Sequence, residues 1–225
     1  MRYVELHCKS NFSFLEGASH PDELVERAAE LGYSGLALTD RESVAGVVRG
    51  FTPAKEFGLQ YIVGTEVHPS DGPPLVLWPT DRSAYGRMCH LISRGRLRAE
   101  KGSCDLRWDD VAEFSDGMLM AVNPVASSQF AANSKKEFDV LLETVNRQLS
   151  TARGVFGDRA YLLCELHRGV DDRLQVERLR QLSRKSELPL VAAGDVHYHM
   201  PQRMLMQDGV TAIRNGTTID QVHQH

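Results

Sequence analysis

The chain has 225 residues, of which 42% are hydrophobic and 25% are charged, a composition typical of a soluble globular protein. Its formal net charge is -4 at pH 7 and its pI is about 6.1, which argues against a surface that is basic throughout, as nucleic-acid platforms usually are. The N-terminus has no apolar signal core, no apolar run could cross a bilayer, and the four scattered cysteines form no C-x-x-C pair. We therefore expect a cytoplasmic protein with no thiolate zinc knuckle and no membrane partner.

Short apolar runs alternate with longer amphipathic stretches along the chain. In chain order, we expect strands at residues 3–7, 35–39, 60–64, 74–78, 117–122, 160–164 and 188–193. We expect helices at residues 21–31, 43–57, 83–94, 134–152 and 171–186, with Ser19 as a candidate N-cap before the first. Strands that alternate with helices imply a parallel sheet or barrel, so we expect an α/β fold, and the absence of a long linker favours a single domain.

Histidines and acidic residues follow four of the expected strands. These residues are, in chain order, His7, Glu16, Asp40, Glu66, Asp195 and His197. Because the carboxyl ends of parallel strands meet at one rim, we expect these side chains to converge there. Imidazoles and carboxylates are ligands for a divalent metal such as zinc or manganese. Each residue alone is weak evidence, since an aspartate after a strand, such as Asp40, is often only a helix N-cap.

Five segments resemble a known family in order and spacing. They are ELHCKSNFSFLEGASHP at residues 5–21, LTD at 38–40, GTE at 64–66, GDVHY at 194–198 and QDGVTAIRNG at 207–216. They resemble the PHP (polymerase and histidinol phosphatase) domain of bacterial C-family DNA polymerases, most closely the error-prone branch. The resemblance implies a distorted (β/α)7-type barrel over residues 1–225, of which about 200–225 lead toward a following polymerase domain or form a natural tail. It is weakest at residues 100–159.

The resemblance also implies that several metal ligands are lost. Positions that keep a competent ligand are His7, Glu16, Glu66, Asp195 and His197. Lys9 stands where the family has the second histidine of H-x-H, and Arg41 stands where it has the histidine of T-D-H. Two further ligand positions fall on Pro74 and Pro124. We expect a degenerate cluster with no metal or one residual divalent ion.

Lys9 and Arg41 offer no lone pair near neutral pH, so neither can ligate a metal. Carboxylates held close together repel one another unless a positive charge lies between them. We therefore expect Lys9 and Arg41 to replace the metal charge among Glu16, Asp40, Glu66 and Asp195. The alternative is that both point to solvent and a single metal remains on His7, Glu66, Asp195 and His197.

By resemblance, the chain is the N-terminal PHP domain of an error-prone translesion or repair polymerase, or a free-standing relative, with a structural role. Its partners would be DNA and the other polymerase domains, which carry the nucleotidyl-transfer carboxylates, so no catalytic residue is assigned here. One alternative is an active metal-dependent phosphoesterase or 3'-5' exonuclease that uses metal-activated water. Another is a non-enzymatic interaction module. The basic stretch at residues 82–101 could face DNA phosphates, but we favour a solvated helix face.

Overall fold

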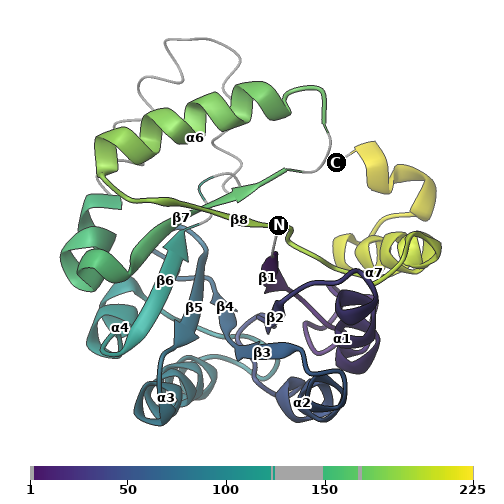
Figure 1. Ribbon diagram of the computed structural model, residues 1–225, viewed down its shortest axis with the longest axis horizontal. Helices are drawn as coiled ribbons and strands as arrows, with labels where there is room; N and C mark the ends of the chain where they lie inside the picture. Colours follow the sequence, from purple (N-terminus) through teal and green to yellow (C-terminus); the bar gives the residue numbers. More distant parts are fainter. Residues whose placement is uncertain (1–2, 123, 125–148, 167–168, 225) are drawn as a thin grey trace. The chain divides into compact units, whose positions relative to one another are not determined.

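The computed structural model describes residues 3–122, 124, 149–166 and 169–224 (Figure 1). The chain forms two compact units. Unit 1 comprises Met1–Thr65 and Gly194–His225, and unit 2 comprises Glu66–Ala193. Within the described ranges, no helix has the length and apolar character needed to span a membrane.

Unit 1 is built on a three-stranded parallel sheet. Its strands are β1 (Val4–Cys8), β2 (Gly35–Leu38) and β3 (Gln60–Val63), in that order. Helix α1 (Pro21–Glu30) connects β1 to β2, α2 (Val47–Glu56) connects β2 to β3, and the two helices pack against each other. The core between them and the sheet consists of Cys8, Leu24, Val25, Ala28, Leu36, Leu38, Ala54 and Leu59. Packing in this apolar layer holds β1 and β2 in position. It therefore also positions the residues that follow these strands.

The last part of the chain returns to β1 inside unit 1. The Lys9 amide donates to the Val196 carbonyl at 2.8 Å, and the Val196 amide donates to the His7 carbonyl at 3.0 Å. The chain then forms η3 (Pro201–Arg203), α7 (Met204–Asn215) and η4 (Ile219–Gln224), and α7 and η4 pack against each other (Figure 1). The pairing places residues 195 and 197 directly beside residues 7 and 9.

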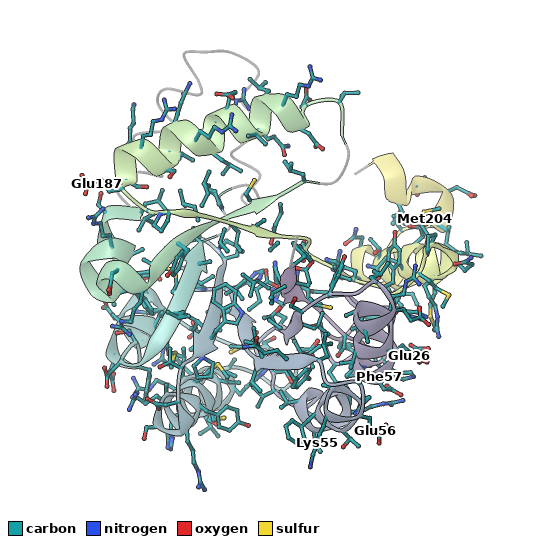
Figure 2. All side chains as sticks on the ribbon, viewed as in Figure 1. Glu26, Lys55, Glu56, Phe57, Glu187 and Met204 are labelled. Carbon is teal, nitrogen blue, oxygen red and sulfur yellow. The ribbon has the colours of Figure 1, made fainter. Side chains whose placement is uncertain are left out.

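Unit 2 contains a five-stranded sheet whose strands follow chain order. They are β4 (Thr65–Val67), β5 (Leu75–Pro79), β6 (Met118–Val122), β7 (Ala160–Glu165) and β8 (Leu190–Ala193). Its helical segments are α3 (Arg82–Arg98), α4 (Trp108–Glu113), residues 149–156, η2 (Gly157–Arg159) and α6 (Asp172–Ser186). In Figure 2, Glu187 marks the end of α6, where it adopts a left-handed φ of 56°.

One pair of strands departs from the expected parallel order. Strand β6 runs antiparallel to β5, with Pro79 opposite Met118. Two helices, α3 and α4, lie between these strands instead of one, so the chain re-enters the sheet at the end where it left it. Thr80 directly follows β5 and Gly117 directly precedes β6, and the Thr80 amide donates a hydrogen bond to the Gly117 carbonyl at 2.9 Å.

The expected elements need four further corrections. The helix expected at 43–57 begins only at Val47, and the one expected at 83–94 runs on to Arg98. Ser19 is not the N-cap of α1: His20 is, and its amide donates to the Glu23 carboxylate at 2.8 Å. Strand β4 and helices α4 and α7 were not predicted. Most of the helix expected at 134–152 lies outside the described residues.

Candidate functional site

Asp195 is the centre of the cluster in unit 1. Its Oδ1 atom lies 3.1 Å from Lys9 Nζ, 3.1 Å from His197 Nε2 and 3.6 Å from His7 Nδ1. His7 and Lys9 are buried and two residues apart on an extended chain, so their side chains share one face. One carboxylate oxygen therefore faces three side-chain nitrogens.

The surroundings of Asp195 keep it ionised. Burial raises its pKa, but the hydrogen bond with His197 and the charges of His7 and Lys9 outweigh burial and hold the pKa well below its ordinary value. Its backbone has a φ of 46°, a left-handed conformation that aspartate tolerates better than most residues. The strain is consistent with a side chain whose direction is fixed by its partners.

Glu16 forms a second charged contact in the same unit. Its buried carboxylate pairs with the Arg41 guanidinium, and Arg214 of α7 lies 3.8 Å away. The Glu16 carbonyl lies 2.9 Å from His197 Nδ1 and accepts a hydrogen bond from Gln207 Nε2 at 2.8 Å. Because His197 contacts both Asp195 and the Glu16 backbone, it connects the two charged pairs.

Asp40 is buried beside neutral hydrogen-bond donors. It accepts from the Ser10 amide at 2.7 Å, from Ser10 Oγ at 2.8 Å and from Ser13 Oγ at 2.8 Å. Burial raises its pKa more than these hydrogen bonds lower it. Asp40 is not the N-cap of the following helix, because α2 starts at Val47 after Gly46. It ties the loop after β1 to the end of β2.

Glu66 belongs to unit 2, where it lies on β4. Its buried carboxylate lies 3.1 Å from His68 Nε2. Pro74 directly precedes β5. Of the six proposed ligands, the structure therefore brings His7, Asp195 and His197 together, connects Glu16 to them through His197, and places Asp40 among serines.

Several contributing residues were missed from the sequence. Buried Glu5 accepts hydrogen bonds from the His7 amide at 2.9 Å and the Gly194 amide at 2.8 Å, and so holds β1 against the returning chain. Its alternation with His7 along the strand could have identified it. Gln207 and Arg214 lie in the segment at 207–216 that resembles the family, but no site role was assigned to them, because α7 itself was not predicted.

Part of the basic stretch is engaged with acids of unit 2. Arg98 donates two hydrogen bonds to Asp110, at 2.8 and 3.0 Å, and Arg94 donates to Glu113 at 2.5 and 2.8 Å. The Arg98 guanidinium lowers the pKa of Asp110 to about 2. These two arginines join α3 to α4, and the role of the basic stretch stays a prediction.

With this geometry established, comparison with known proteins identifies the family. The sequence matches the PHP domain model over residues 5–168, and the chain belongs to the PHP domain family. It is 57% identical over 226 residues to an error-prone DNA polymerase of Rhodopirellula baltica, and 40% identical over 223 residues to one of Pseudomonas paraeruginosa. The alignments cover 99% of this chain but only 19% and 20% of those proteins, so the chain spans about a fifth of their length.

Solved structures share the fold at low sequence identity. An amidohydrolase of Chromobacterium violaceum superposes with a TM-score of 0.60 at 15% identity and covers 87% of both chains. Endonuclease Q, solved with a duplex substrate that carries an abasic lesion, gives a TM-score of 0.55 at 12% identity over 88% of this chain and 49% of its own. The predicted α/β fold of PHP type, in which parallel strands and helices alternate as in a distorted barrel, is confirmed.

The side chains of unit 1 fit only in part the metal chemistry that the resemblance implies. His7, Asp195 and His197 offer nitrogen and oxygen donors of the kind that zinc and manganese accept. Yet the Asp195 oxygen already faces the Lys9 ammonium at 3.1 Å, and the Glu16 carboxylate faces Arg41. A divalent ion would meet a fixed positive charge at both carboxylates, so this donor set does not fit a full cluster of metals.

Proposed function

We propose that this chain is the N-terminal PHP domain of an error-prone DNA polymerase that acts in translesion or repair synthesis. The support is the identity of 57% to such a polymerase over 99% of the chain. In this proposal, the domain supports the polymerase structurally and does not hydrolyse phosphoesters efficiently. Its partners are DNA and the other domains of the polymerase, and it works in the cytoplasm.

The observation that carries the structural role is the ion pair between buried Lys9 and partly buried Asp195. Lys9 is only 6% exposed, and its ammonium lies 3.1 Å from the carboxylate. Opposite charges about 4 Å apart attract by roughly 4 kcal/mol at an effective dielectric constant of 20, before the cost of desolvation. In the proposal, Lys9 supplies the charge that a metal supplies in an intact site, and Arg41 does the same for Glu16.

A second candidate function is a metal-dependent phosphoesterase or 3'-5' exonuclease. The observation in its favour is that His7 and His197 still approach Asp195, at 3.6 and 3.1 Å. If Lys9 moved aside, these three side chains could hold one divalent ion. That ion would supply an activated water for hydrolysis.

The test uses the natural polypeptide that contains this chain, purified without chelators. Three quantities are measured: primer extension on a DNA template, hydrolysis of p-nitrophenyl phosphate and DNA 3' ends, and bound zinc and manganese. We expect primer extension, little hydrolysis, and a metal content that His197→Ala leaves unchanged. Absence of primer extension would contradict the polymerase assignment. Strong hydrolysis, lost with the metal in His197→Ala, would establish the phosphoesterase instead.

A further inference from the structure

We propose that α7 carries an interdomain docking face, formed by Met206, Val210 and Ile213 together with Phe14. Its occupant is an apolar surface of the polypeptide that follows the matching segment in the longer relatives. The inference rests on the proposed function, because it requires the chain to be part of a longer polymerase. Beyond the proposed function, the inference names the residues that form the contact between domains.

Helix α7 is oriented opposite to an ordinary amphipathic helix, which buries its apolar side. Its inner side carries buried Asp208 and Ala212, and Gln207 donates to the Glu16 carbonyl at 2.8 Å. Met206, Val210 and Ile213 follow the i, i+4, i+7 spacing of one helix face. Met206 is 52% exposed and Ile213 is 68% exposed. Met204, at the start of the helix, is exposed as well (Figure 2).

A hollow next to this face makes it suitable for a protruding apolar side chain. It has a volume of about 200 Å³, and its lining includes Phe14, Leu15, Met206 and Val210. Phe14 is 84% exposed at the edge of the hollow. Single exposed apolar residues are common, but an apolar helix face beside an exposed aromatic ring and a hollow is typical of an interaction site.

The distribution of charge favours a protein partner over nucleic acid. The two charged residues of α7 are directed away from the face: Asp208 is buried, and Arg214 lies near Glu16 at 3.8 Å. Arg203, at the edge of the hollow, pairs with Glu23. Binding to nucleic acid depends on cations that neutralise phosphates, and the three apolar α7 residues and Phe14 provide none.

The length of the relatives favours the following polypeptide as the occupant. The alignment with the Rhodopirellula baltica polymerase covers 99% of this chain, α7 included, but only 19% of that protein. A domain joined in the same polypeptide has a high effective concentration, so a small apolar patch is enough to bind it. A separate second copy would need a larger contact, of at least about 1,000 Å² in total.

Hydroxyl-radical footprinting of the intact natural polypeptide tests this directly. The labelling rate of Met206 is compared in the parent, in Ile213→Asp, and in Phe51→Asp as a matched control on α2, where Phe51 is 56% exposed. We expect Met206 to be protected in the parent and in the control, and to label several-fold faster in Ile213→Asp. Met200, 38% exposed and outside α7, is the internal methionine reference.

Three results would overturn the inference. The first is that Met206 labels faster than Met200 in the parent. The second is a natural polypeptide that ends at residue 225. The third is protection that disappears on dilution together with a dimer in sedimentation, which would identify a second copy as the occupant. Primer extension is measured on the same samples: a polymerase with an unprotected Met206 contradicts only this inference, whereas a protein without primer extension contradicts the proposed function.

Discussion

At the scale of single residues, the buried charge on Lys9 is the most consequential feature. If it compensates Asp195, Lys9→Ala should lower the free energy of unfolding by up to about 3–5 kcal/mol, the cost when a deeply buried pair loses one partner. Chemical denaturation measures this. Lys9→Met retains the packing of the aliphatic stem, so a similar loss in that variant would assign the effect to charge.

Lys55→Ala is the matched control for this prediction. Lys55 is exposed on α2 in the same unit (Figure 2), and its removal should change stability by less than about 0.5 kcal/mol. If Lys9→Ala unfolds at the same denaturant concentration as Lys55→Ala, Lys9 does not compensate the Asp195 carboxylate.

Asp40 gives a second prediction at this scale. Asp40→Ala removes the acceptor for the Ser10 amide and both serine hydroxyls, and an unsatisfied buried donor costs about 1–3 kcal/mol. Asp40→Asn retains one oxygen acceptor and should cost less. Thermal melting of the two variants checks this order. Equal stability of Asp40→Ala and the parent would mean that these hydrogen bonds do not hold the loop.

The sequence predicted residue positions better than residue partners. Strand periodicity and the family resemblance placed Asp195 and His197 correctly after β8, whereas His7 lies within β1, one residue before its end. They did not reveal that Asp40 bonds to Ser10 and Ser13, because serine is common in loops and marks no partner. The ligand roles and the metal-replacing roles of Lys9 and Arg41 stay predictions.

At the scale of elements, the contact between α3 and α4 depends on Asp110. Its pKa of about 2 is below the usual value for aspartate. A lowered pKa stabilises the fold above the unfolded-state pKa near 3.9, and the stabilisation is lost as the pH falls toward about 2. Asp110→Asn should therefore lower the melting temperature by about 2–4 °C at pH 7 and by less near pH 2.

Asp109→Asn controls for the charge of the helix N-terminus. Both aspartates lie in the first turn of α4, but Asp109 is exposed and Asp110 is buried. Each variant removes one negative charge from the N-terminus of α4, so a loss of helix-dipole stabilisation would lower both melting temperatures alike. If differential scanning calorimetry gives equal shifts for the two, the arginine contacts do not stabilise α4.

Elements were missed where tertiary contacts, not local pattern, determine them. Helix α7 leaves most of its large apolar residues exposed, so the usual expectation of an inward apolar stripe gives no guidance. Strand β4 has only three residues, too few for a clear periodicity. The antiparallel β6 depends on the extra helix α4, which is six residues long.

At the scale of the whole molecule, we expect a domain with little hydrolytic activity of its own. The chain should turn over phosphomonoesters and DNA 3' ends poorly even with added zinc or manganese, since the Asp195 and Glu16 carboxylates face Lys9 and Arg41. Steady-state assays with each metal measure this. Robust turnover that His197→Ala abolishes would show that the site is an active phosphoesterase.

Melting of Lys9→His/Arg41→His with and without zinc tests whether the Lys9 and Arg41 side chains stand in for metal. The new imidazoles can ligate, and zinc at 100 times its dissociation constant would stabilise the fold by about 2.7 kcal/mol. We expect the double variant to melt below the parent in chelator and to gain about 5–10 °C with zinc, while the parent and the same variant with His197→Ala gain little. This role would be contradicted if zinc did not raise the melting temperature of the double variant, or if zinc raised the melting temperature of the parent as much.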